Sequence, residues 1–189
     1  MNAPAINLPQ RKKAKLTVED YLVLDDRGAF ERYGKTELIA GEIYYMNSQH
    51  RPHARMKSRL FVELAKALAA FPGLEAIVEG SISIPPYNVP EPDIVVTDQP
   101  DGEGLIPLAS VKLVIEVADT TIRNDLTRKA KLYAAAGVPE YWVIDLNAGT
   151  LHQMWSAGAK GFAQRRETTL GGRIESVTLA GLAVETGGL

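Results

Sequence analysis

Residues 111–117, VKLVIEV, have the pattern of a buried β-strand that carries one carboxylate, Glu116. A second acid, Asp93, follows Pro92 and stands directly before the apolar run IVV at residues 94–96. Burying a carboxylate among valines and isoleucines is costly unless a partner neutralises it. We therefore predict that Asp93 and Glu116 lie on adjacent core strands and hold a cation between them. A hard divalent cation such as Mg²⁺ suits one or two carboxylates supplemented by water and phosphate oxygens.

The residues that follow this strand predict a helix over 125–136. Asp125, Lys129 and Tyr133 recur every fourth residue, so they share one stripe of that helix, and Gly137 ends it. The connection from the strand is short, which places Lys129 about one turn into a helix that begins near Glu116. A bound Mg²⁺ polarises a phosphate and activates water, and a neighbouring ammonium stabilises the developing charge. The group Asp93, Glu116 and Lys129 therefore indicates a metal-dependent phosphodiesterase.

The remaining chain predicts a mixed α/β domain in which helices cover a sheet. Thr17 is a candidate N-cap for a helix that ends near Gly28, and Ala40-Gly41 is the turn of a hairpin over 36–46. Leucines at helical spacing predict an amphipathic helix over 51–71. Further strands are expected at 76–84, 91–97, 140–146, 151–155 and 162–167, with a loop at 98–110. Residues 16–189 form a single expected domain, preceded by a flexible, basic tail over residues 1–15.

Composition narrows the possible functions. The 189 residues carry a formal net charge of −2, so no overall basic field points to nucleic acid. Cysteine is absent, which excludes disulfides, thiolate catalysis and cysteine-ligated zinc and agrees with a cytoplasmic location. The first residues lack the pattern of a secretion signal, and no apolar stretch has the length of a membrane span. We expect no membrane partner.

Four segments together resemble the Uma2 family, which belongs to the PD-(D/E)XK nuclease superfamily. They are EPD at 91–93, EVADTT at 116–121, the Asp125, Lys129 and Tyr133 spacing, and GVPEYWVID at 137–145. ELIAGE at 37–42, followed by His53, is similar to the N-terminal signature of that family. The resemblance covers about residues 17 to 184, and its most specific part is the block 116–145. It implies a restriction-endonuclease-like core, with a central mixed sheet flanked by helices.

The resemblance also implies roles for individual residues. Asp93 and Glu116 match the two motif acids, and with the Val117 carbonyl they would bind Mg²⁺ or Mn²⁺. The superfamily usually has a lysine two residues after the glutamate, where this chain has Ala118. The resemblance implies a migrated lysine, and Lys129 matches that position.

Three further residues are candidates for the site. Lys131 competes with Lys129 but lies off the stripe that Lys129 shares with Tyr133. Glu42 and His53 are supporting candidates, the first near the metal and the second near the phosphate.

Each candidate also fits a structural role. Asp93 fits a cap at a strand start, and Glu116 fits a core acid paired with a lysine or arginine. Lys129 alone would be a surface lysine, Asp125 favours any helix N-terminus, and Tyr133 suits the core as well as a site. Only the combination of these residues points to chemistry.

The leading hypothesis is an Mg²⁺-dependent endonuclease that hydrolyses DNA. One alternative is an inactive nuclease fold that serves as a DNA-binding or protein-interaction module. Another is a metal-dependent hydrolase of a different phosphoester, such as RNA or a nucleotide. The Tyr44-Tyr45 hairpin and the strands after residue 150 predict pairing between two subunits, and the resemblance likewise implies a homodimer.

Overall fold

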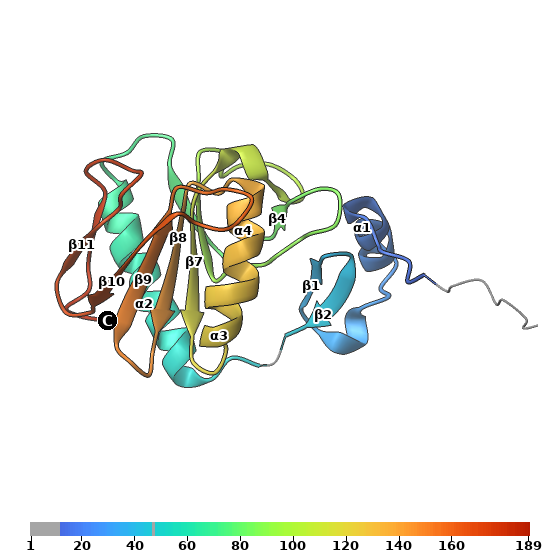
Figure 1. The fold of residues 1–189 in the computed structure, drawn as a ribbon, viewed down its shortest axis with the longest axis horizontal. Coiled ribbons are helices and arrows are strands. Elements are labelled where there is room, and N and C mark those ends of the chain that lie inside the picture. Colours follow the sequence, from blue (N-terminus) through green and yellow to red (C-terminus); the bar gives the residue numbers. More distant parts are fainter. Residues whose placement is uncertain (1–11, 47) are drawn as a thin grey trace, which may run out of the picture.

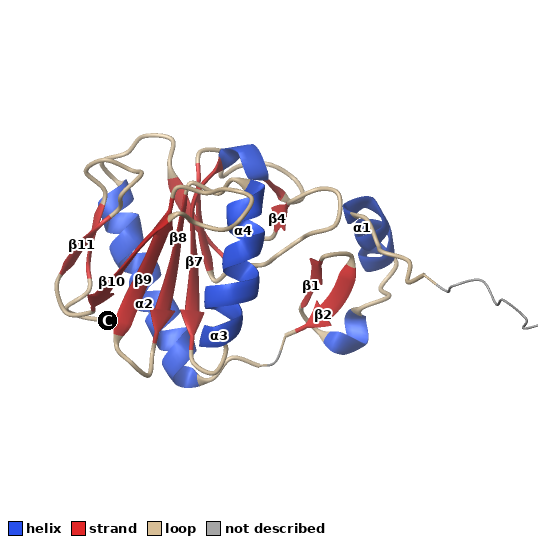
Figure 2. Ribbon diagram, in the orientation of Figure 1, coloured by secondary structure: helices blue, strands red, loops and turns tan. Residues whose placement is uncertain are grey.

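A six-stranded sheet lies between two helical layers in the computed structural model, which describes residues 12–46 and 48–189 (Figures 1 and 2). Its strand order is β10-β9-β8-β7-β5-β3. The strands are β3 (Glu75–Val78), β5 (Ile94–Thr97), β7 (Val111–Ala118), β8 (Glu140–Asp145), β9 (Thr150–Trp155) and β10 (Gln164–Thr169). Only β7 and β8 pair in parallel, and every other neighbouring pair in this sheet is antiparallel. The predicted mixed α/β fold is confirmed.

Side chains alternate between the two faces of the sheet and thereby fix where each acid points. Leu113 and Ile115 of β7 pack on the face covered by α2 (Arg51–Leu68). Val114 and Ala118 pack on the other face, against α4 (Ala130–Ala136). Glu116 lies two residues after Val114 and therefore points to the same face of the sheet, toward α4 and the turn before it.

The N-terminal part forms a small lobe beside the sheet (Figure 1). It contains α1 (Val18–Asp26), the 3₁₀ turn η1 (Glu31–Tyr33), and the hairpin of β1 (Thr36–Ile39) and β2 (Glu42–Tyr45). Thr17 caps α1 through a capping box with Asp20. Ala40 and Gly41 turn the hairpin with φ angles of 55° and 80°, as a tight two-residue turn requires. The helix start and the hairpin both agree with the sequence prediction.

The prediction of one strand over 76–84 was wrong. The segment divides into β3 and the short β4 (Ile82–Ser83), with Glu79 and Gly80 between them. Glu79 has a φ of 56°, which ends the extended conformation. A Cβ on Gly80 would lie 2.6 Å from Ile106 Cδ1, so any larger residue there would require Ile106 to shift.

The predicted helix over 125–136 is longer and interrupted. It begins with α3 (Ile122–Asn124), passes through a π-helical turn, η3 (Asp125–Lys129), and continues as α4. Gly137 ends it in the left-handed conformation, as predicted. A π-turn inserts extra backbone into one turn and is frequent at functional sites.

Several elements were not predicted. The loop 98–110 contains β6 (Ile106–Pro107) and the 3₁₀ turn η2 (Leu108–Ser110), and β6 pairs with β4. After β10, a hairpin of β11 (Arg173–Glu175) and β12 (Ala183–Glu185) packs Ile174 and Val184 into the core on the α2 face.

The predicted tail of residues 1–15 lies largely outside the described residues, since the description begins at Lys12. Residues 12–15 have no helix or strand, and Lys15 packs against Gly41. Within the part of the chain that is described, no helix combines the length and apolar character needed to traverse a bilayer.

Candidate active site

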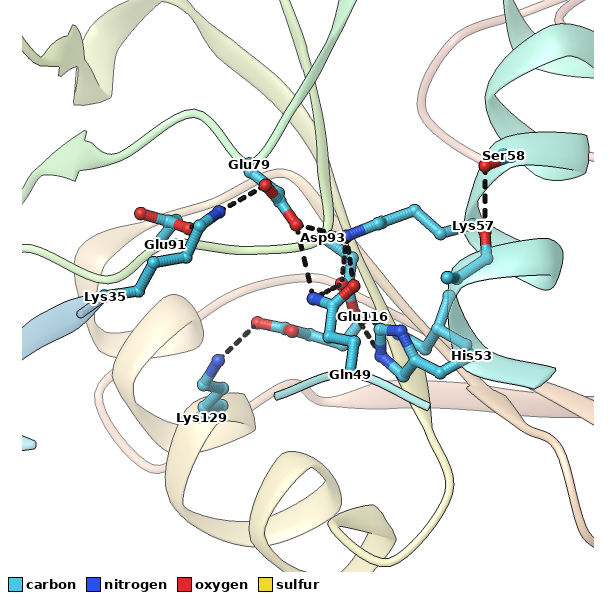
Figure 3. Close-up of polar contacts among 12 residues, drawn as sticks. Lys35, Gln49, His53, Lys57, Ser58, Glu79, Glu91, Asp93, Glu116 and Lys129 are labelled. Carbon is cyan, nitrogen blue, oxygen red and sulfur yellow. Dashed lines mark hydrogen bonds and ion pairs between the residues drawn. The ribbon is translucent and has the colours of Figure 1, made fainter. Parts of the chain in front are cut away.

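A cavity of about 490 Å³ opens where the C-terminal end of β7 meets α2, η3 and the β1–β2 hairpin. Polar side chains from all of these elements converge on it, as Figure 3 shows for the central group. Its acidic lining residues include Glu37, Glu79, Glu91, Asp93, Glu116 and Asp125.

Glu116 anchors one half of the site. Its Oε1 accepts hydrogen bonds from Lys129 Nζ at 2.9 Å and from the Tyr133 hydroxyl at 3.2 Å. Lys129 Nζ also lies 3.1 Å from Glu37 Oε1, so this one ammonium joins β7 to the hairpin strand β1. All four residues are buried. Lys129 and Tyr133 contact the same oxygen of Glu116, so they still share one face of the helix despite the π-turn, as the sequence predicted.

Asp93 anchors the other half. Its Oδ2 accepts the backbone N–H of Val117 at 2.8 Å and lies 3.2 Å from His53 Nε2. Its Oδ1 lies 3.5 Å from Lys57 Nζ. His53 and Lys57 are one helical turn apart on α2, and that helix therefore presents two basic groups to this carboxylate.

An ion-pair chain extends behind Asp93. Glu79 bonds both Lys57 and Lys35, and Lys35 Nζ lies 2.9 Å from Glu91 Oε1 (Figure 3). The two lysine contacts lower the pKa of Glu79 from 4.5 to about 2, against a smaller opposing effect of burial. Glu79 is thus held as a carboxylate.

The Glu116 side of the site is short of positive charge. Burial raises the pKa of Glu116 well above its usual value, and the charges of Asp93, Asp125 and Glu37 raise it further against the opposing effect of Lys129. Burial opposes the charge on Lys129, but Glu116 and Glu37 outweigh it and raise the pKa of the ammonium. Lys129 therefore stays charged, yet it is shared among several acids.

The Asp93 side is electrostatically satisfied. Burial opposes ionisation of Asp93, but the His53 and Val117 contacts prevail and lower its pKa. Burial likewise disfavours protonated His53, and the contact with Asp93 outweighs it and raises the pKa of the imidazole. Asp93 is held ionised, with His53 and Lys57 as its positioning residues.

The structure brings most of the sequence candidates together. Asp93, Glu116, Val117, His53, Lys129 and Asp125 all line the cavity, and Tyr133 contacts Glu116 from behind. Asp125 is buried and accepts a hydrogen bond from the Thr121 hydroxyl at 2.6 Å, consistent with a structural role at the turn.

Two candidates lie elsewhere. Glu42 is exposed, accepts a hydrogen bond from the Tyr44 hydroxyl at 2.9 Å and lies 3.7 Å from Lys13. It is absent from the cavity lining, so the expectation that it lies near the metal is not met; Glu37, on the paired strand, lies at the site instead. Lys131 is exposed and also outside the lining.

Lys57 and Glu79 were missed by the sequence prediction. Lys57 did leave a signal, because it precedes Leu60 and Leu64 by three and seven residues and therefore occupies a core position of the amphipathic helix. A buried lysine there requires an acidic partner. Glu79 left no comparable signal, because its role depends on a local turn.

The oxygen atoms of Asp93, Glu116 and Val117 suit a small, hard cation. Glu116 Oε2 has no hydrogen-bond partner among the described residues, whereas Oε1 has two. Those residues contain no ready-made group of three or more acidic or histidine ligands. A cation here would therefore take the two carboxylates, the Val117 carbonyl and oxygens from water or phosphate, which is the ligand set that Mg²⁺ favours.

Comparison with known proteins identifies a family and a similar fold. A family model described as "Putative restriction endonuclease" matches residues 18–185, nearly the whole chain. One matching solved structure is described as "a putative nuclease belonging to DUF820 from Anabaena variabilis". The two chains are 16% identical with a TM-score of 0.66, over 85% of this chain and 89% of the other. At that identity the likeness establishes a common fold. No curated protein matches the chain.

Proposed function

The chain belongs to the Uma2 family, and on that premise we propose that it is a divalent-metal-dependent nuclease that hydrolyses phosphodiester bonds in DNA. Asp93, Glu116 and the Val117 carbonyl would hold Mg²⁺, with Mn²⁺ as a substitute. RNA is the alternative substrate, because its nucleotides are joined by the same phosphodiester linkage.

The observation that carries the proposal is the contrast between two buried glutamates on neighbouring strands. Glu140 on β8 is saturated by donors from Trp142, Ser176, Val177 and Thr178, and these hydrogen bonds lower its pKa against the effect of burial. Glu116 on β7 faces other acids, and its pKa is raised. Glu140 needs no cation, whereas Glu116 lies where an added cation would relieve the repulsion among acids.

The residues divide the chemistry between them. A bound Mg²⁺ supplies phosphate polarisation and a water of lowered pKa. Lys129, which remains an ammonium beside Glu116, orients the attacking water and stabilises negative charge on the phosphate. His53 and Lys57 hold Asp93 in its ionised form and fixed orientation, and Tyr133 fixes Glu116.

The test combines metal binding with cleavage. We expect wild type to cut plasmid and oligonucleotide substrates with Mg²⁺ or Mn²⁺, and its melting temperature to rise with either ion. Glu116→Gln and Asp93→Asn should lose both responses. Lys129→Met should lose cleavage by a factor of about 10² or more, the usual scale for a group that stabilises transition-state charge.

Glu42→Gln is the matched control, because it removes an exposed carboxylate outside the cavity. It should retain wild-type cleavage and metal response. A metal-dependent rise in melting temperature that persists in both Glu116→Gln and Asp93→Asn would refute the assigned site. Metal binding at the site without cleavage of DNA or RNA would refute the nuclease assignment and favour a binding module.

A further inference from the structure

Three tyrosines lie on or beside the β1–β2 hairpin next to the cavity, with Tyr44 and Tyr45 on opposite faces of β2 because successive strand residues alternate. Tyr44 and Tyr45 come from β2 and line the cavity, and Tyr33 comes from η1. The rings of Tyr33 and Tyr45 stack, with centroids 5.9 Å apart and an interplanar angle of 23°. We call Tyr33, Tyr44 and Tyr45 the tyrosine platform.

Two arginines sit on the rings of the platform. The Arg128 guanidinium lies 4.1 Å from the centroid of Tyr44, and that of Arg32 lies 4.6 Å from the centroid of Tyr33. Arg128 directly precedes Lys129, so one turn of η3 serves both the platform and Glu116. The mouth of the cavity therefore combines aromatic faces with positive charge.

The platform is open to solvent rather than packed in the core. Tyr45 is 64% exposed and Tyr33 is 40% exposed, although both are large aromatic residues. Aromatic faces interleaved with arginine are the surfaces on which proteins stack unpaired bases, because every base offers a π-face and the arginines attract the phosphates.

The two acids expose little of their surface to an approaching nucleic acid. Asp93 and Glu116 retain only 7% and 5% of their exposure, so a phosphate must enter the cavity to contact them. A duplex that bends or extrudes a nucleotide to bring a phosphate closer pays free energy for that distortion. A single strand enters without that cost, and its bases are free to stack at the mouth.

We propose that the tyrosine platform stacks unpaired bases, and that the substrate of this site is therefore single-stranded nucleic acid or a single-stranded segment within a duplex. This inference rests on the proposed nuclease function for its biological meaning. The binding that it predicts is measurable without catalysis.

The experiment is fluorescence anisotropy with a labelled 20-nucleotide oligo-dT and a labelled 20-base-pair duplex, both in EDTA so that no cleavage occurs. The single strand should bind about tenfold more tightly than the duplex or better. Tyr45→Ala should weaken single-strand binding about tenfold, since stacking on one aromatic residue contributes on that scale. Tyr45→Phe keeps the ring and should retain the affinity.

Tyr87→Ala is the matched control. Tyr87 is also exposed, at 37%, and also lies under a cation, Lys15, but it is outside the cavity lining. Its substitution should leave binding unchanged. Circular dichroism of each variant checks that the fold is retained.

Equal or tighter binding of the duplex would overturn the inference, as would wild-type affinity in Tyr45→Ala. The same surface could instead be a contact between two subunits, and light scattering tests this alternative. If Tyr45→Ala converts a dimer to a monomer while nucleic-acid affinity is unchanged, the platform is a subunit contact and the inference fails. Failure of the nuclease proposal has a different signature, which is tyrosine-dependent single-strand binding with no metal-dependent cleavage.

Discussion

Glu79 combines an unusual backbone with an unusual acidity. Its φ of 56° places it in the left-handed region, which few residues other than glycine adopt. This conformation breaks β3 from β4, and the Glu79 carboxylate bonds Lys35 and Lys57. Backbone strain of this kind collects at functional sites, where the surrounding contacts maintain it.

The stability of the protein should therefore depend on pH through Glu79. Its folded pKa of about 2 lies below the ordinary 4.5, so the unfolded chain binds more protons between these values. The stabilisation is present above about pH 4.5 and is lost as the pH falls toward 2.

Urea unfolding of wild type and Glu79→Gln across this range measures the effect. The difference in unfolding free energy should be largest near pH 6 and should shrink as the pH falls, and added salt should reduce it because the side chain is partly exposed. A difference that does not vary with pH would exclude this explanation.

Single residues also limit what the sequence could predict. Glu116 and Glu140 both adjoin apolar runs, and the many donors around Glu140, including those on residues 176–178, distinguish it from Glu116 in space. Glu37 and Glu42 occupy the same hairpin, and the pairing of β1 with β2 decides which of them faces Lys129. In both cases the deciding partner is far away along the chain, so local pattern could identify acids but not their surroundings.

At the scale of elements, α2 is the support for Asp93. It packs its leucines on the sheet and presents His53 and Lys57 at its N-terminal end. Basic groups that orient a metal-binding carboxylate are expected to affect metal affinity about 10–100-fold when removed.

Lys57→Met tests this role, because methionine retains most of the apolar volume of lysine. We expect calorimetric titration to show Mn²⁺ affinity lowered about 10–100-fold, while helix content is unchanged. Lys66→Met on the same helix, where the lysine is exposed and pairs with Glu63, should bind Mn²⁺ like wild type. Unchanged affinity in Lys57→Met would show that Lys57 only balances charge within the core.

The periodicity of apolar residues predicted where helices and strands lie more reliably than where they are interrupted. The strand at 111–117 and the helix from Arg51 appear as expected, because each buries one regular face. The π-turn over 125–129 could not be predicted from the sequence, because inserting backbone into a turn does not change the apolar stripe on either side. The hairpin of β11 and β12 was missed because each strand has only three residues.

At the scale of the whole molecule, Glu140 joins the C-terminal segment to the sheet. Its carboxylate accepts hydrogen bonds from Trp142 at 2.6 Å and from Ser176 at 2.6 Å, as well as from the backbone of Val177 and Thr178. Hydrogen bonds to a charged group contribute more than neutral ones, and each donor left unsatisfied in the core is costly.

Glu140→Ala should therefore lower the free energy of unfolding by about 3 kcal/mol or more. Glu140→Gln keeps one acceptor oxygen and should cost less. Guanidinium unfolding followed by tryptophan fluorescence measures both, since Trp142 donates to this carboxylate. Loss of less than about 1 kcal/mol in Glu140→Ala would show that water replaces the carboxylate, because a typical net hydrogen bond contributes about that much.

The same carboxylate has a consequence for how the protein is made. A ribosome releases the chain from its N-terminal end, so β8 emerges before Ser176, Val177 and Thr178, which satisfy Glu140, and before Ile174 and Val184, which cover the α2 face. Domains generally fold as units during synthesis. The nascent domain must therefore wait for about forty further residues after β8 before its core closes, and throughout that interval it exposes apolar surface to chaperones and proteases.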